Sequence, residues 1–402
     1  MFLLAGCALR EEEETGSQPV SSSWEEDAES SDETEYEDSE TEEEDGGDGE
    51  EDLFAEENGG FYYGQLPEAQ QDLYRDIFET IEAEESSCIL ETDDSSVIGP
   101  ALNAVLLDHP EFFWLDGAAS YYGYEGSRKK RLELVFNLPA EEIADVREEI
   151  EEARDACLDL LDEDADDYEK VRTVYAGLIE ETDYVPGSDQ NQNIQSVFLN
   201  RESVCAGYAK AFQYLLQAAD IECVCVTGTA QSESGRTENH SWNLVSIDGE
   251  YYWADPTWGD PAYVNSDGDF EPYETIFYDY LCLTTEEMER AGHEPDPSWD
   301  YPECTEREYD FYVYEDCFFE EYDEEALSDL LEESVEDEEE PVIRIKYADE
   351  EAYEEACDAL FGGEESLLSE PLQDWMRAHG ESTVSYSYHC DDALYTIRIY
   401  IG

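Results

Sequence analysis

Basic residues are scarce in this chain. Lysine and arginine together number 19 against 110 aspartates and glutamates, which gives a formal net charge of -91 at pH 7. Nucleic acids and anionic membrane surfaces carry the same sign of charge and would repel such a protein. We therefore exclude nucleic acid as a partner. The acidic surface fits a protein kept soluble outside the cell or in high salt.

Long hydrophobic runs are also missing. No segment approaches the ~20 consecutive apolar residues that a membrane-spanning helix needs. Sequence patterns for metal sites are lacking too, because none of the 11 cysteines forms a C-x-x-C pair and no D-x-D-x-D-G loop is present. A structural zinc site and an EF-hand calcium site are thus not expected, and we predict neither a metal nor a cofactor.

The N-terminus offers a different kind of membrane attachment. Leu4-Ala5-Gly6-Cys7 resembles the lipobox of bacterial lipoproteins, in which the signal peptide is cut before a cysteine that then carries lipid. Residues 1 to 7 would then be the remainder of a signal peptide with Cys7 as the lipidation site, although a chance match remains open. A non-lipoprotein signal would instead give a secreted protein. We expect a bacterial lipoprotein on the extracellular face of the membrane.

Residues 8 to 60 are rich in Glu and Asp among Ser, Thr and Gly, with Arg10 as the one base. So little apolar surface cannot offset the entropy of ordering, and we predict a disordered, self-repelling tether. The remaining chain divides into an N-terminal α/β region (61 to 139), a central domain (140 to 304) and a small C-terminal α/β domain (305 to 402).

Periodic apolar residues predict several elements in these regions. We expect helices over 67–84, 100–107, 140–159 and 168–179, and a strand over 131–138. The C-terminal domain is predicted to run strand, helix, strand, helix, strand, strand, with 342–345 and 395–400 as its clearest strands. No internal repeat is present.

The central domain carries a cysteine at the start of a predicted helix. After Cys205, apolar residues fall on one helical stripe: Tyr208, Ala211, Phe212, Leu215 and Leu216. The positive end of that helix would favour the thiolate of Cys205, and the small residues Ala206 and Gly207 would let a substrate approach. A buried, inert cysteine is the alternative.

A predicted hairpin follows, with a histidine and an aspartate at its open end. A strand over 221–226 and a polar loop over 228–238 precede two strands, 240–247 and 250–255, joined by Asp248-Gly249. If Ile247 faces Glu250, His240 lies opposite Thr257 and diagonal to Asp255, so both side chains share a face. The carboxylate could then hold one imidazole nitrogen and leave the other for a thiol.

These segments together resemble the transglutaminase-like superfamily of papain-like cysteine enzymes. The resemblance runs from about residue 171 to 258 and rests on three separated motifs. They read Val-Cys-Ala-Gly-Tyr-Ala-Lys-Ala-Phe at 204–212, His-Ser-Trp-Asn at 240–243, and Asp-Gly-Glu-Tyr-Tyr-Trp-Ala-Asp-Pro-Thr-Trp at 248–258. The resemblance implies an α+β fold in which the helix bearing the cysteine packs on an antiparallel sheet bearing His and Asp.

The same resemblance implies Cys205 as nucleophile, His240 as general base and then acid, and Asp255 as the residue that orients it. Gln192 is where related bacterial sequences place a polar residue that could stabilise the oxyanion, although Asn191, Asn193 and Gln195 compete for that role. Side chains expected along the cleft are Tyr208, Trp242 and Trp258. His109 and His293, in weaker flanking similarities, are interpreted as structural residues.

Three functions follow from this reading. The first is a cell-surface cysteine hydrolase that cleaves amide bonds in peptides, proteins or the peptides of the cell wall. The second is a transglutaminase that joins a glutamine side chain to an amine, since both reactions use the same residues and differ in whether water or amine reaches the thioester. The third is an adhesion or scaffold module without activity. Oligomeric state has no signal in the sequence.

Overall fold

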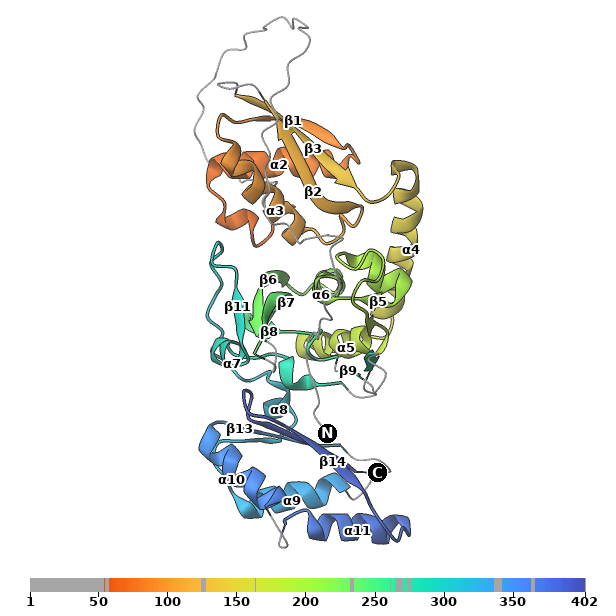
Figure 1. Ribbon diagram of the computed structural model, residues 1–402, viewed down its shortest axis with the longest axis vertical. Coiled ribbons are helices and arrows are strands. Elements are labelled where there is room, and N and C mark those ends of the chain that lie inside the picture. The colour runs from red at the N-terminus through yellow and green to blue at the C-terminus, as the bar shows by residue number, and fades with distance from the viewer. Residues whose placement is uncertain are drawn as a thin grey trace, which may run out of the picture.

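The computed structural model describes residues 54, 58–123, 128–162, 164–231, 235–260, 262–264, 270–272, 276–335, 342–362 and 366–401. The expected lipidation site at Cys7 and nearly all of the acidic stretch 8–60 lie outside these residues. Three parts follow one another along the long axis of the molecule (Figure 1). All three combine helices with mainly antiparallel sheets, so the predicted α+β class is confirmed. Within the described part, no helix is both long and apolar enough to cross a membrane.

The N-terminal part is a three-stranded sheet backed by two helices. Its strands are β1 (Ser87–Glu91), β2 (Leu115–Tyr122) and β3 (Lys129–Phe136), in the antiparallel order β1-β3-β2. Helices α2 (Glu68–Glu82) and α3 (Ile98–Asp108) confirm the predicted helices. The apolar stripe of α2 is buried, because Leu73, Ile77, Phe78 and Ile81 all pack into the main core.

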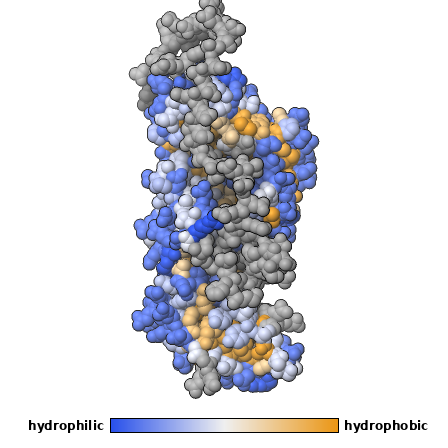
Figure 2. Space-filling view, viewed as in Figure 1, coloured by the Kyte–Doolittle hydropathy of each residue, from blue (hydrophilic) through white to orange (hydrophobic). Residues whose placement is uncertain are grey.

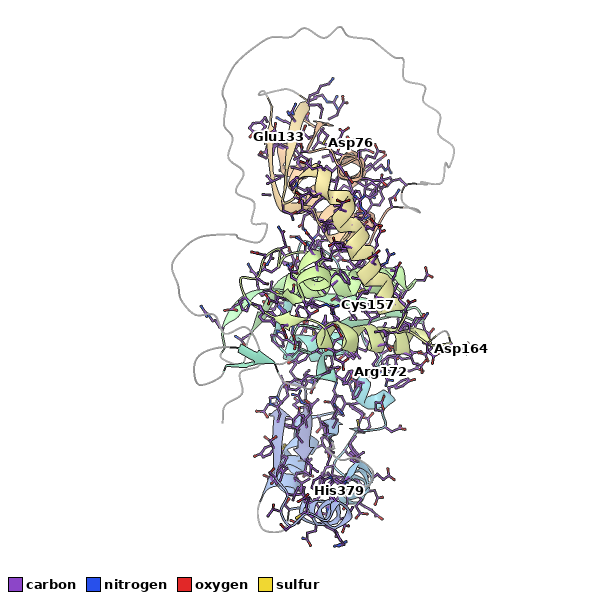
Figure 3. All side chains as sticks on the ribbon, turned by 90° about the vertical axis from the view of Figure 1, so that its right-hand side faces the viewer. Asp76, Glu133, Cys157, Asp164, Arg172 and His379 are labelled. Atoms are coloured by element: carbon purple, nitrogen blue, oxygen red, sulfur yellow. The ribbon has the colours of Figure 1, made fainter. Side chains whose placement is uncertain are left out.

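Helix α4 (Ala140–Leu158) leads from this sheet to the central part. Figure 3 shows α4 running from the neighbourhood of Glu133 down to the central helices, where Cys157 lies near its end. Helix α5 (Asp167–Glu180) then begins with a capping box, in which Asp166 and Glu169 bond each other's backbone N–H groups. Arg172 on α5 forms an ion pair with Glu315, just beyond α8 (Phe311–Tyr314).

The central part places helix α6 (Cys205–Ala218) against a four-stranded antiparallel sheet. The sheet order is β11 (His293–Pro295), β6 (Cys223–Gln231), β7 (Thr237–Ile247) and β8 (Glu250–Ala254). All five predicted stripe residues of α6 are buried. The expected pairing of Ile247 with Glu250 is confirmed, since Asp248 and Gly249 both adopt positive φ in a tight turn.

One expectation about this sheet is wrong. The polar segment 228–238 is mostly strand, because β6 continues to Gln231 and β7 already begins at Thr237. The backbones of these polar residues pair with each other, as Gln231 does with Thr237, and this pairing outweighs their composition.

The C-terminal part has its own sheet and its own hydrophobic core. Strands β12 (Phe318–Phe319), β13 (Val342–Tyr347), β15 (Thr396–Ile401) and β14 (Tyr386–Asp391) lie in that order. Helices α9 (Glu324–Val335), α10 (Glu350–Phe361) and α11 (Ser369–His379) pack against it (Figure 1). The predicted element order lacks α11. Its Pro371 is typical of a break in a helix, but this proline lies in the first turn, where proline is tolerated.

Short elements complete the described part of the chain. They are η1 (Tyr63–Gln65), η2 (Ser95–Val97), β4 (Asp183–Tyr184), η3 (Ser196–Asn200), β5 (Glu202–Ser203), β9 (Ala262–Val264), β10 (Phe270–Pro272), η4 (Tyr278–Tyr280) and α7 (Thr285–Arg290).

Buried ion pairs join the central and C-terminal parts. Nη1 of Arg398 lies 3.1 Å from Oδ2 of Asp279, and Nζ of Lys346 lies 2.9 Å from Oε1 of Glu287 and also contacts Asp310. All five side chains are nearly inaccessible. The face in Figure 2 is largely hydrophilic, with hydrophobic patches over the C-terminal part and beside the N-terminal sheet.

Candidate active site

Cys205 is the first residue of α6. Val204 precedes it in an extended conformation, and the Cys205 side chain is half-buried. The first N–H groups of a helix have no acceptor within it, so those at Cys205 and Ala206 are available to a ligand. Gly207 keeps this turn narrow, since a Cβ there would lie 1.9 Å from Oγ of Ser203 and 2.8 Å from Oγ of Ser196.

His240 lies near the start of β7 and opposite Gly228 on β6. Its side chain is buried between two indole rings, with centroids 5.8 Å from Trp242 and 5.6 Å from Trp258. Nε2 of His240 donates to Oδ2 of Asp255 over 2.7 Å. Because that bond occupies Nε2, Nδ1 is the nitrogen left to face a thiol.

Asp255 follows β8 directly and is completely buried. Its Oδ1 accepts hydrogen bonds from the backbone N–H groups of Thr257 (2.9 Å) and Trp258 (3.1 Å), so the turn after the strand fixes the carboxylate. Burial alone would raise the pKa of Asp255, but the charge of His240 and hydrogen bonds from His240 and His293 hold it well below its usual range. The carboxylate is therefore ionised at neutral pH.

The thiol completes the chain of contacts. Burial would lower the pKa of His240, yet the charge of Asp255, its hydrogen bond, and a hydrogen bond with Cys205 raise that pKa well above its ordinary value. His240 therefore lies between the Asp255 carboxylate and the Cys205 side chain, and both neighbours favour its protonated form. The structure thus brings Cys205, His240 and Asp255 together, with His240 between the other two.

Gln192 lies on the loop before η3 and is exposed. Its Nε2 donates to Oδ1 of Asn191 over 3.0 Å, and its backbone carbonyl accepts from Nζ of Lys210 on α6. Of the competing side chains, Gln195 is buried and donates to the carbonyl of Phe113. Gln192 as a donor to the oxyanion stays a prediction.

The three aromatic residues expected along the cleft differ in exposure. Tyr208 and Trp242 are completely buried, and the Tyr208 hydroxyl bonds the carbonyl of Thr182 and, over 2.6 Å, Oδ2 of Asp260. Trp258 is half-buried, and its ring contacts those of His240 and His293. Of the three, Trp258 is the one that retains access to solvent beside His240.

A second histidine joins the same carboxylate. Nε2 of His293, on β11, lies 3.0 Å from Oδ2 of Asp255, and the two imidazole centroids are 5.5 Å apart. The sequence interpretation of His293 as structural missed this contact. His293 reaches Asp255 because β11 pairs with β6, and a strand of three residues is too short to be predicted from the sequence pattern.

His240, Asp255 and His293 also form a possible set of metal ligands. Within the described part of the chain, one ligand atom from each lies within 4.8 Å of the others. The separations of 2.7 and 3.0 Å from Oδ2 are hydrogen-bond distances, which place a proton on each Nε2. The geometry is accounted for by these two hydrogen bonds.

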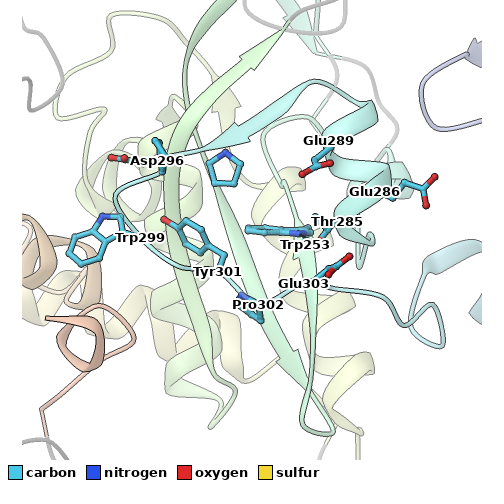
Figure 4. Close-up of a pocket in the computed structure, with 11 residues that line it drawn as sticks. Trp253, Thr285, Glu286, Glu289, Asp296, Trp299, Tyr301, Pro302 and Glu303 are labelled. Atoms are coloured by element: carbon cyan, nitrogen blue, oxygen red, sulfur yellow. Dashed lines mark hydrogen bonds between the residues drawn. The ribbon is translucent and has the colours of Figure 1, made fainter.

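A separate cavity of about 620 Å³ opens beyond Trp253 of β8. Figure 4 shows Trp253, Trp299 and Tyr301 along it, with the carboxylates of Glu286 and Glu289 at the opposite side. The Trp242 ring contacts that of Trp253 and also stacks on His240. Cys205, His240 and Asp255 are not among the residues that line this cavity.

Residues 155–256 match the model of the transglutaminase-like superfamily. The chain carries a transglutaminase-like core. That matched segment contains Cys205, His240 and Asp255.

Two curated relatives align over the same core. Kyphoscoliosis peptidase of Mus musculus is 27% identical over 151 residues, and that of Homo sapiens is 26% identical over 151 residues. The alignment takes in 34% of this chain but spans only 22% of the length of each relative. These relatives of the transglutaminase-like core are named peptidases.

Two solved structures share partial similarity. A crystal structure of a TGase matches with 13% identity and a TM-score of 0.25, covering 35% of this chain and 44% of that one. The periplasmic domain of TgpA from Pseudomonas aeruginosa matches with 16% identity and a TM-score of 0.19, covering 32% and 53%. Neither structure adds evidence about the activity of the transglutaminase-like core.

Proposed function

We propose that this chain is a cysteine hydrolase that cleaves amide bonds in peptides or in the peptides of the cell wall. The observation that carries the proposal is the buried hydrogen bond between His240 and Asp255, with the Cys205 side chain near enough to His240 to raise its pKa. Burial of His240 and Asp255 keeps water from competing for these bonds. The peptidase names of the curated relatives support this reading.

The proposed reaction uses these three residues in turn. The Cys205 thiolate attacks the amide carbonyl carbon, and the negative charge that develops on its oxygen is stabilised by N–H groups at the start of α6. His240 gives its Nδ1 proton to the leaving amine and leaves a thioester on Cys205. Neutral His240 then takes a proton from water, whose oxygen attacks the thioester and releases a carboxylic acid, and this returns Cys205 to the thiolate and His240 to its protonated form.

A transglutaminase is the second candidate. It uses the same first half-reaction with a glutamine side chain and releases ammonia, after which a primary amine attacks the thioester in place of water. The superfamily match of residues 155–256 favours keeping this alternative. A scaffold without activity is less well supported, because all three groups are present, His240 bonds Asp255, and Cys205 lies near enough to His240 to raise its pKa.

For the whole chain, we propose a protein anchored outside the cell through lipid on Cys7, with the acidic stretch as a tether. The sequence Leu4-Ala5-Gly6-Cys7 and the acidic composition that follows support it. Expression in a bacterial host with a functional export signal tests the anchor. Metabolic labelling with a fatty acid should mark the wild type and leave Cys7→Ser unmarked. A membrane fraction without lipid on the wild type would contradict this anchor.

The activity is tested with the purified chain and a pool of glutamine-bearing peptides, incubated with and without a primary amine. Mass spectrometry should find new peptide termini, or deamidated glutamine, that are absent with Cys205→Ala. Mass gains that depend on the amine would instead favour the transglutaminase. No product in any reaction, together with an unreactive Cys205, would favour the scaffold.

A further inference from the structure

His293 stands outside the cysteine, histidine and aspartate used by the proposed reaction, yet it is bonded to the same carboxylate oxygen as His240. Oδ1 of Asp255 is satisfied by two backbone N–H groups, and Oδ2 accepts from both imidazoles. This gives four hydrogen bonds to one carboxylate that has no exposure to solvent. The position of Oδ2 is thereby set from two sides, by β7 and by β11.

The local backbone explains how His293 reaches across the sheet. Strand β6 lies between β11 and β7, and Gly228 on β6 is paired with both His240 and Pro295. A Cβ at Gly228 would lie 2.2 Å from the carbonyl oxygen of Glu294 and 2.7 Å from Cη2 of Trp242. Glycine therefore allows β11 and the Trp242 ring to close over β6.

The His293 ring is held firmly in this position. It is 1% exposed and packs against Trp258 (4.4 Å between centroids), Trp242 (5.1 Å) and Tyr280 (6.2 Å). Three aromatic neighbours leave the ring little freedom to rotate away from Asp255.

The protonation states of the two histidines differ. Burial lowers the pKa of His293, the pull of Asp255 opposes this, and the nearby charge of His240 lowers it further. His293 is therefore neutral and donates through Nε2, while the positive charge resides on His240. A neutral donor supports the carboxylate without competing with His240 for the role of cation.

We propose that His293 is a positioning residue of the reaction, which fixes Oδ2 of Asp255 so that His240 presents Nδ1 to Cys205. This role rests on the proposed cysteine chemistry. It acts through Asp255, because the hydrogen bond of His293 in the described part of the chain is to that carboxylate and not to the Cys205 thiol.

Two variants separate positioning from packing. His293→Gln keeps an N–H donor that reaches the place of Nε2, and His293→Leu fills the space without a donor. The readout is the rate at which iodoacetamide alkylates Cys205, measured by peptide mass spectrometry at about pH 5.5 and about pH 9.5. At the lower pH an ordinary thiol is protonated, so fast alkylation requires the thiolate and imidazolium pair.

We expect the wild type and His293→Gln to react rapidly at the lower pH. His293→Leu should lose about tenfold there, the size expected for one hydrogen bond to a charged group. All three should react alike at the higher pH, where the thiolate forms without help. Equal rates for all three at both pH values, or an equal loss in both variants, would overturn the positioning role.

The same measurement distinguishes failure of the proposed function. If the wild type itself lacks fast alkylation at the lower pH, Cys205 and His240 form no ion pair, and both the cysteine chemistry and the role of His293 fall. If the wild type reacts rapidly and His293→Leu reacts equally fast, only the role of His293 falls.

A second, independent inference concerns two half-buried cysteines of the C-terminal part. Sγ of Cys357, on α10, lies 3.8 Å from Sγ of Cys390, on β14. The hydrogen bond between the two sulfurs lowers the pKa of the Cys357 thiol, which makes Cys357 the better nucleophile of the two. The structure assigns this pair as a dithiol that a low-molecular-weight disulfide can oxidise to an internal crosslink.

The exchange balances without a further reagent. The Cys357 thiolate attacks one sulfur of the reagent and releases one thiol, and the Cys390 thiolate then attacks Cys357 and releases the second. The protein loses two hydrogens and two electrons, and the reagent gains them. The crosslink would join α10 to the sheet that it covers.

Oxidised glutathione tests this on the full chain. Peptide mapping should find the peptides of Cys357 and Cys390 joined, while the half-buried Cys88 and Cys157 carry glutathione or stay free. In Cys357→Ser, Cys390 should carry glutathione instead. Glutathione on both Cys357 and Cys390 in the wild type, or no modification of either, would overturn the assignment.

Discussion

Nε2 of His240 donates a 2.7 Å hydrogen bond to Oδ2 of Asp255 from a position 15 residues earlier in the chain. The turn after β8 holds the other carboxylate oxygen, so the direction of this bond is set by the backbone. Its consequence is a single tautomer for neutral His240, with Nδ1 free to take a proton from Cys205. The acyl-transfer proposal depends on that tautomer.

Asp255→Asn should therefore abolish most activity without unfolding the protein. The two backbone N–H groups require an oxygen at the δ1 position, which places the amide NH₂ against Nε2 of His240. The imidazole would respond by moving its proton to Nδ1, the nitrogen that must accept from Cys205. Peptide turnover should fall by about 10³-fold or more.

Circular dichroism of Asp255→Asn should match the wild type. Activity within a few-fold of the wild type would show that Asp255 does not set the tautomer of His240.

Gly207→Ala should destabilise the protein at the start of α6. The added Cβ would lie 1.9 Å from Oγ of Ser203, 2.8 Å from Oγ of Ser196 and 3.2 Å from the backbone oxygen of Asn191. We expect a loss of about 1–3 kcal/mol in the free energy of unfolding, measured in urea. Alkylation of Cys205 should slow as well, since the turn that carries the thiol must shift.

Gly177→Ala is the matched control, because Gly177 lies in helix α5 with nothing within 4 Å of its Cβ position. That variant should be stabilised by about 0.5–1 kcal/mol, as alanine is the better helix former. If both variants lose the same stability, crowding at Gly207 is not the cause.

Lys346→Met should weaken the contact between the C-terminal part and the central part, and so lower the stability of the protein. The substitution leaves Glu287 and Asp310 buried at the interface without the lysine that lies against both. Removing one partner of such a buried group costs about 3–5 kcal/mol. Urea denaturation should show a lower midpoint, with the C-terminal part unfolding first by hydrogen exchange.

The triple variant Lys346→Met, Glu287→Gln and Asp310→Asn removes the stranded charges and should recover much of the lost stability. A triple variant as unstable as Lys346→Met would contradict this electrostatic origin.

Asp260→Asn should reduce the pH dependence of stability. Burial raises the pKa of Asp260 to about 7, and a carboxyl with a raised folded-state pKa contributes stability that is present at low pH and lost as pH rises. The loss occurs between about pH 4, where the unfolded carboxyl titrates, and pH 7, at about 1.4 kcal/mol per pKa unit. Asparagine still accepts from the Tyr208 hydroxyl.

At pH 8, Asp260→Asn should therefore melt at a higher temperature than the wild type, and at pH 4 the two should be alike. A variant less stable than the wild type at pH 8 would mean that the Asp260 carboxylate is stabilising in the fold.

Much of the central fold could be predicted from the sequence, because its signals are local. The stripe after Cys205 and the turn Asp248-Gly249 specify α6 and the hairpin, and the hairpin register brings His240 near Asp255. His293 could not be placed this way. Its strand has three residues and no alternation, and its partner strand β6 ends 62 positions earlier in the chain.

Helix α11 was obscured for a different reason. Pro371 lies in its first turn, and glycines precede the helix. Both residue types are typical of loops, so the local sequence predicts a loop here. Burial of Leu372 and Trp375 against the C-terminal sheet stabilises the helix, and this contact arises only in the folded domain.

The central claim is that Cys205 forms an acyl-enzyme with a peptide substrate. The most direct measurement is intact-protein mass spectrometry of the wild type, quenched in acid during turnover of the glutamine-bearing peptide pool. We predict an added acyl mass on Cys205 of the wild type, together with release of product. Cys205→Ala should show neither the added mass nor the product. Peptide cleavage or amine transfer that persists in Cys205→Ala, with no adduct on the wild type, would contradict it.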